Sequence, residues 1–142
     1  MKTWIVNTNS KAKNGNPNGF LFMLRQNKIS SYYKKKTSVD IISPGDLILL
    51  YHNRNRIIAV GFALKNDLHD FADISDVEHW VDVNWIWKST FRKIDNSYEP
   101  LDPINRKDIK IKSFRKTVEN ISNQIDFKLL MVRIGERQNL VR

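Results

Sequence analysis

The chain has no cysteine, and no hydrophobic run in its 142 residues approaches the roughly 20 apolar residues of a membrane span. Without cysteine there is no disulfide scaffold, no thiolate nucleophile, no iron–sulfur cluster and no zinc site of the cysteine type. Gly-rich phosphate loops and G-x-S-x-G elbows are also missing. Met1 leads into a strand-like segment with no signal-peptide core, so we expect an intracellular, cytoplasmic protein.

Basic residues outnumber acidic residues by 24 to 15, which gives a net charge of +9. Residues 1–50 carry 8 basic and 2 acidic side chains, residues 51–100 carry 6 and 8, and residues 101–142 carry 10 and 5. Two basic ends therefore flank a mildly acidic middle. Such an asymmetry predicts a polyanionic partner, with nucleic acid first and an acidic membrane surface second.

No internal repeat, low-complexity tract or long linker divides the chain, which predicts one domain over residues 1–142. Hydrophobic periodicity and turn residues locate its elements. We expect strands at residues 3–7, 47–51, 57–64, 80–87 and 127–134, a helix at 19–27, two helical pieces within 102–123, and loops at 8–19 and 66–78. This order favours an α+β fold, a small, curved, mostly antiparallel β-barrel with flanking helices.

The segment 47–51 is apolar on both faces and is therefore expected to be a central strand. It should form an antiparallel hairpin with residues 57–64, in which Gly61 marks a bulge or a bend. Alternation is cleanest over residues 80–87. It puts Trp80, Asp82, Asn84 and Ile86 on one face and Val81, Val83, Trp85 and Trp87 on the other, which predicts Trp85 and Trp87 as core residues.

Three segments share a pattern with one family. Residues 3–9 form an aromatic and aliphatic strand that ends in small polar residues. Residues 43–52 contain a Gly-Asp turn and a hydrophobic strand ending in Tyr-His, and an aliphatic strand with a glycine follows at 58–63. In residues 79–86 a tryptophan shortly precedes a V-x-W-I strand. In this order the segments resemble the PUA-like superfamily, specifically its EVE and YTH branch of modified-base readers.

The resemblance covers residues 3 to about 92 and does not extend over the last third of the chain. YTH domains have a second cage tryptophan in a region that corresponds to residues 10–38, where this sequence has none. A second wall of the cage would then come from another aromatic residue: Tyr32, Tyr33, Phe22 or Trp4.

The resemblance implies a domain that captures one flipped-out, modified base of DNA or RNA, in a restriction or defence setting, without a cofactor or catalysis of its own. An aromatic wall returns about 1–3 kcal/mol per stacked base, and side-chain amides can read the edge of the base. Trp80 is the expected wall, because alternation gives it polar neighbours; the alternative is a tryptophan that plugs the barrel end. The predicted base-contacting residues are Trp80, Asp82, Asn84, Asn7, Thr8, Asn9, Tyr51 and His52.

The densest basic segment is expected to hold the nucleic-acid backbone. It interleaves aromatic side chains with lysines, a pattern that suits a phosphate track and also suits a solvated helix end. Its residues are Arg25, Lys28, Tyr32, Tyr33, Lys34, Lys35 and Lys36. A second and more diffuse basic group consists of Arg106, Lys107, Lys110, Lys112, Arg115 and Lys116.

Two other classes of function stay open. The tripeptides at 108–110 and 126–128 each match the D-x-K half of a restriction-type nuclease core, which would make the protein a Mg²⁺-dependent nucleic-acid enzyme using Asp108 or Asp126. The other class is a protein-interaction domain whose positive charge only confers solubility. His69 and His79 lie among acidic residues but match no metal-ligand spacing, so we predict no metal site there.

Overall fold

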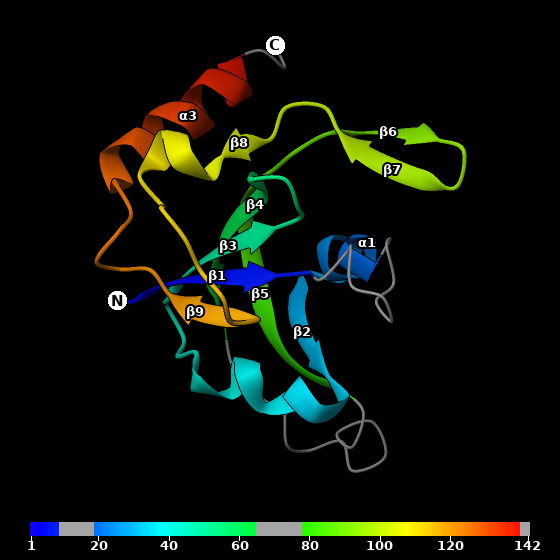
Figure 1. Cartoon of the computed structure of the whole chain (residues 1–142), viewed down its shortest axis with the longest axis vertical. Helices are drawn as coiled ribbons and strands as arrows, with labels where there is room; N and C mark the ends of the chain where they lie inside the picture. Colours follow the sequence, from blue (N-terminus) through cyan, green and yellow to red (C-terminus); the bar gives the residue numbers. More distant parts are fainter. Residues whose placement is uncertain (9–18, 65–77, 140–142) are drawn as a thin grey trace.

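The computed structural model describes residues 1–8, 19–64 and 78–139, apart from the side chains of residues 32–36 and 139 (Figure 1). Its elements in chain order are β1 (Thr3–Asn7), α1 (Gly19–Arg25), β2 (Lys28–Tyr32), the 3₁₀ helix η1 (Tyr33–Ile41), β3 (Leu47–Tyr51), β4 (Arg56–Ala63), β5 (Glu78–Lys88), β6 (Phe91–Ile94), β7 (Ser97–Pro100), β8 (Ile104–Asn105), the 3₁₀ helix η2 (Arg106–Ile109), β9 (Val118–Asn120) and α3 (Phe127–Asn139).

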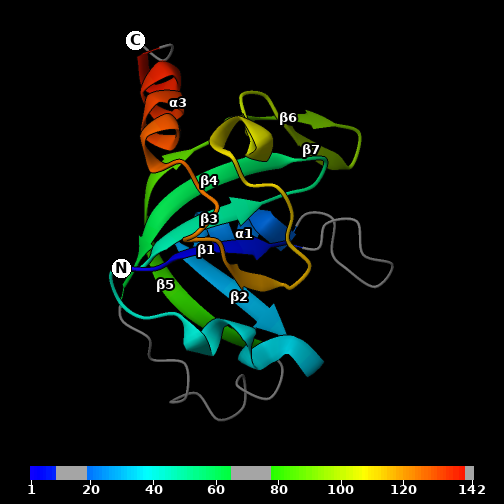
Figure 2. The ribbon, with the colours of Figure 1, turned by 60° about the vertical axis from the view of Figure 1, so that its left-hand side comes forward.

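The strands form one strongly curled sheet and a separate hairpin. The sheet has the order β2-β5-β4-β3-β1-β9, with β8 added to β4, while β6 pairs with β7. Neighbouring strands are antiparallel except for β1 and β3, which are parallel. Among the described strands no pairing joins the edges β2 and β9, so the sheet curls into a half-barrel (Figure 2). The predicted α+β class, curved antiparallel sheet and flanking helices are confirmed.

Both faces of the sheet are buried. Alternate residues of β1 belong to different core clusters, Trp4 and Val6 to one and Ile5 to the other. The first cluster packs α1 and η1 against the sheet, and the second packs α3 and the chain between residues 104 and 121 against the opposite face. All four residues at 47–50 are fully buried, which confirms the predicted central strand.

The register between β4 and β5 shifts by one residue at Gly61. Val60 lies opposite Trp87 and Gly61 lies opposite Trp85, so Ile86 is the extra residue of a β-bulge. Trp85 therefore packs at the margin of the first core cluster, while Trp87 is buried in the second. This corrects the prediction that both tryptophans share a face, because strict alternation ends at the bulge.

The predicted strand at residues 127–134 is wrong: this segment is the first two turns of α3. Leu130 and Ile134, four residues apart, are buried against the sheet, which is the helical spacing of an apolar stripe. The helix is capped by Asp126, whose Oδ1 accepts a hydrogen bond of 3.0 Å from the Leu129 N–H. A short apolar run fits both periodicities, and the cap decides in favour of the helix.

The two helical pieces predicted within residues 102–123 are also wrong, because only the four residues of η2 are helical there. The segment instead crosses the second core face, and its four isoleucines are all fully buried: Ile104, Ile109, Ile111 and Ile121. Lys110, with a φ of 67° in the left-handed region, ends η2.

The sequence did not predict β2 or the β6–β7 hairpin. The predicted helix at 19–27 is confirmed as α1.

The side chain of Asp46 connects β1 to the turn before β3. Asp46 is 5% exposed, and its carboxylate accepts hydrogen bonds from the Trp4 indole N–H at 2.8 Å and from the backbone N–H groups of Lys2 and Ser43, each at 3.0 Å. Burial raises the pKa of Asp46, but the hydrogen bonds from Trp4, Lys2 and Ser43 outweigh it and hold the pKa below its ordinary value of 3.8.

A first prediction concerns acid stability. Because the folded-state pKa of Asp46 is lowered, its contribution is fully present above 3.8 and is lost as the pH falls through the folded-state value. We expect Asp46→Asn to lower the free energy of unfolding near neutral pH by about 1.5–3 kcal/mol, the range for hydrogen bonds to a charged group. Urea titrations across this pH range should show the gap between variant and wild type narrowing in acid; a constant gap would contradict the assignment.

A second prediction concerns Gly61. A Cβ at this position would lie 2.5 Å from the Asn84 carbonyl oxygen and 2.9 Å from Cε3 of Trp85. We therefore expect Gly61→Ala to lower the free energy of unfolding by about 1–3 kcal/mol through overpacking. Gly135 in α3 has nothing within 4 Å of the equivalent Cβ, so Gly135→Ala should be neutral or stabilising. Equal effects of the two variants in chemical denaturation would contradict the close packing at the bulge.

Candidate nucleic-acid interface

Four of the predicted base-contacting residues lie together at the carboxyl ends of β1 and β3. Because these strands are parallel, Asn7 lies beside Tyr51 in the register, and the Thr8 N–H donates to the Tyr51 carbonyl at 3.0 Å. His52 follows directly, and its carbonyl accepts from the Thr8 hydroxyl at 3.4 Å. The predicted neighbour Asn9 lies outside the described residues.

This corner is densely packed. His52 is 5% exposed, its ring meets Phe20 edge-on at 4.5 Å between centroids, and its Nδ1 lies 3.3 Å from Nη2 of Arg56. The ring of half-buried Tyr51 packs edge-on against Phe114 at 4.7 Å. Arg56 also forms an ion pair of 2.8 Å with Glu99, and the hydrogen bond from Arg56 is the main reason why the pKa of Glu99 is lowered. The side chains of Tyr51 and His52 are thus held in place by the fold.

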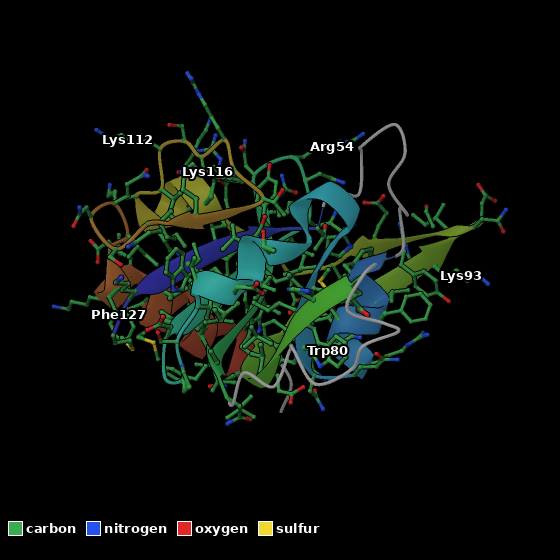
Figure 3. All side chains as sticks on the ribbon, turned by 90° about the horizontal axis from the view of Figure 1, so that it is seen from below. Arg54, Trp80, Lys93, Lys112, Lys116 and Phe127 are labelled. Carbon is green, nitrogen blue, oxygen red and sulfur yellow. The ribbon has the colours of Figure 1, made fainter. Side chains whose placement is uncertain are left out.

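Trp80 lies at the other end of the sheet. It is opposite Ser30 of β2 near the start of β5, whereas the end of β5 at Lys88 is beside β4 and the Tyr51 corner. Eight residues of strand separate Trp80 from Lys88, roughly 25 Å at about 3.3 Å per residue. Figure 3 shows Trp80 on the side of the molecule away from Lys112 and Lys116. The register does not bring the predicted base-contacting residues into one pocket.

The half-buried Trp80 ring packs against the first core cluster and carries a cation above it. Nζ of Lys28 lies 5.0 Å from the ring centroid and forms an ion pair of 2.8 Å with Glu78. The Lys28 side chain is only 15% exposed. Lys28, predicted to bind phosphate, therefore has an anionic partner within the protein, and its ammonium group covers part of the Trp80 ring.

Asp82 and Asn84 are exposed and line a hollow of about 580 Å³ along β5. β2 pairs with β5 only as far as Asp82, and beyond it the β5 edge faces the end of α1. There Asn27, in the left-handed region with a φ of 52°, accepts a 2.8 Å hydrogen bond from the Val83 N–H. The lining residues are Gln26, Asn27, Leu64, Asp82, Val83, Asn84, Trp85 and Lys88.

A second hollow of about 280 Å³ adjoins the first and shares Lys88 with it. It lies between α1 and the β6–β7 hairpin, and its lining is apolar and aromatic with two cations: Leu21, Leu24, Arg25, Lys88, Ser89, Phe91 and Tyr98. The sequence predicts Arg25 as a contact to the nucleic-acid backbone, and it gives no signal for Lys88. We refer to the two hollows together as the β5–α1 groove.

Trp85 is a candidate functional residue that the sequence reasoning assigned to the core. Its ring is half-buried and lines the β5–α1 groove, and its buried Nε1 has no hydrogen-bond partner within the described part of the chain. Buried indole N–H groups usually have a partner. The sequence signal that could have located it is Gly61, which lies opposite Trp85 and leaves room for its ring.

The other basic residues differ in their surroundings. The Arg106 guanidinium donates to the Asn55 side-chain oxygen at 2.8 Å and to the carbonyl oxygens of Ile111 and Lys112. It therefore holds the backbone that follows η2 against the loop at Asn55. The rest of the second basic group is exposed: Lys107, Lys110, Lys112, Arg115 and Lys116. The predicted residues Tyr32, Tyr33, Lys34, Lys35 and Lys36 end β2 and begin η1, and their side chains are outside the described set.

Of the residues considered for the other function classes, Asp126 caps α3, and Asp108 is exposed on η2. His79 is buried, with Nδ1 2.9 Å from Asp40, and His69 lies outside the described residues. Within the described ranges, no three His, Asp or Glu side chains are grouped so that they could hold a metal ion.

Two of the predicted candidates for a second wall of the cage differ in exposure: Trp4 is buried, whereas Phe22 is 52% exposed.

Neither of the described helices α1 and α3 has the length and apolar character needed to cross a membrane.

No protein-family model matches the chain, and no curated protein has significant sequence similarity to it. The functional assignment therefore depends on the chemistry of the β5–α1 groove and on the basic surface.

Proposed function

We propose that this protein is a nucleic-acid-binding domain that accepts one base, a modified base by resemblance to EVE and YTH domains, in the β5–α1 groove. The observation that carries the proposal is the composition of this groove, where aromatic rings, side-chain amides and two cations line adjoining hollows. The curled half-barrel and the β3–β4 hairpin support the PUA-like relationship.

Base recognition would use the polar wall of the larger hollow. Asn84, Asn27 and Gln26 each offer an amide donor and an acceptor, and Asp82 offers acceptors for an exocyclic amino group or a ring N–H. The larger hollow has a volume of about 580 Å³, which lies in the range of pockets for small organic ligands. Trp85 contributes its ring to the lining of the same hollow, while its Nε1 is buried from solvent.

Stacking and charge would supply the affinity. The rings of Trp85, Phe91 and Tyr98 line the groove, and base stacking on an aromatic ring contributes about 1–3 kcal/mol. Arg25 and Lys88 are exposed, and within the described residues neither has an ion-pair partner. Both are therefore available for phosphates, whereas Lys28 is paired with Glu78. This balance of groups supports binding rather than catalysis, and no observation favours a nuclease that uses Asp108 or Asp126.

A third prediction tests the groove. Fluorescence anisotropy with DNA and RNA oligonucleotides, plain and modified, should show binding that weakens as salt is raised. We expect Lys88→Ala and Asn84→Ala each to weaken binding about 5–150-fold, by analogy with the 1–3 kcal/mol of a base contact. Both side chains are exposed, so the fold should be retained. Lys128→Ala on α3 removes the same charge away from the groove and should bind like wild type.

The two tryptophans separate the groove from the pocket predicted around Trp80. Trp85→Leu removes an aromatic ring from the lining of the groove and should weaken binding, while Trp80→Leu should not. The opposite result would move the base site to Trp80. No salt-dependent binding of any oligonucleotide to wild type would refute the proposed function and favour the protein-interaction class.

A further inference from the structure

The open seam of the half-barrel contains a second basic surface. A cleft of about 370 Å³ lies between η1 and the chain entering β9, lined by Thr37, Ser38, Ile41, Arg115, Lys116, Thr117 and Val118. We propose that it binds the phosphate backbone of a single-stranded nucleic acid. This inference rests on the proposed function and names a separate contact for the backbone, away from the base-binding groove.

The lining chemistry suits a phosphate group. Three hydroxyl side chains can donate hydrogen bonds, and Arg115 and Lys116 supply positive charge without an acidic residue in the lining. Both cations are exposed, and among the described residues neither side chain has an ion-pair partner. Thr117, only 8% exposed, is held because its carbonyl accepts a 2.8 Å hydrogen bond from the Asn7 N–H. One wall of the cleft is thereby fixed to the end of β1.

Two acidic residues lie near the lining but do not belong to it. Asp40, on η1, lies 2.9 Å from Nδ1 of His79. Glu119, in β9, accepts the Arg115 backbone N–H at 3.2 Å, so its charge lies beside the cleft. The lining itself contains two cations and no carboxylate, and an anion that enters the cleft would meet cations first.

The fold also brings together two segments that are far apart in the sequence. η1 supplies the hydroxyl groups of Thr37 and Ser38, while Lys112, Arg115 and Lys116 belong to the segment that leads into β9 (Figures 1 and 3). Several exposed cations on one short segment fit a repeating phosphate chain better than a single small anion. The backbone of a polynucleotide is therefore the occupant that we infer.

A fourth prediction tests the cleft by salt dependence. The double variant Arg115→Ala/Lys116→Ala removes the two cations of the lining, both at exposed positions where the fold should be retained. For a single strand, the slope of log K against log salt should become shallower by about 1.4, since each phosphate contact contributes about 0.7. The control Lys107→Ala/Lys128→Ala removes the same charge outside the cleft and should keep the wild-type slope.

The outcomes separate the two proposals. If both double variants change the slope equally, the cleft is refuted, while a loss on Asn84→Ala would still support the groove. If wild type binds no oligonucleotide, both proposals fail. NMR titration of wild type with inorganic phosphate distinguishes the ligand sources: amide shifts at Thr37, Ser38 and Thr117 with phosphate but not with oligonucleotide would overturn the backbone assignment. Shifts at these residues with the oligonucleotide, absent in Arg115→Ala/Lys116→Ala, would support it.

Discussion

The buried Asp46 carboxylate binds the Trp4 indole and the Lys2 backbone N–H and so connects the start of β1 to the turn before β3, and much of the architecture follows from the parallel pairing of these two strands. Parallel neighbours cannot be joined by a tight turn, so the chain between them must cross over, and here it forms α1, β2 and η1 on the way. The crossover carries β2 to the far edge of the sheet and leaves η1 across the open side from β9. The cleft between η1 and the chain entering β9 exists because these two segments face each other without closing the barrel.

The second constraint is steric and acts at Gly61. Because no side chain can occupy this position, β5 can bulge opposite it, and the bulge separates the faces of Trp85 and Trp87. Trp87 completes the second core, whereas Trp85 remains half-buried beside the exposed Asp82 and Asn84. A regular strand would keep both rings on one face, and Trp87 would then no longer complete the second core.

Local patterns in the sequence were sufficient where one physical signal dominates. The all-apolar segment 47–51 and the Pro-Gly turn before it identify β3, and alternation correctly exposes Asp82 and Asn84. Local patterns did not predict the right element where an apolar run fits two periodicities, as in α3. They also failed at residues 104–121, where isoleucines spaced along an extended segment cover the sheet. The grouping of site residues depends on long-range register, which separates Trp80 from Tyr51 and His52 although all three follow reasonable local patterns.

Positive charge has different consequences according to what each cation faces. Lys28 and Arg56 have carboxylate partners, and Arg106 binds main-chain carbonyls, so these residues stabilise the fold. Arg25 and Lys88 lie beside aromatic rings and amides, where charge can position a nucleotide whose base is read by neighbours. Arg115 and Lys116 lie beside hydroxyl and aliphatic side chains, and the lining holds no aromatic ring or side-chain amide that could read a base. Selectivity among bases can therefore arise in the β5–α1 groove and not in the seam, and the net charge alone determines neither.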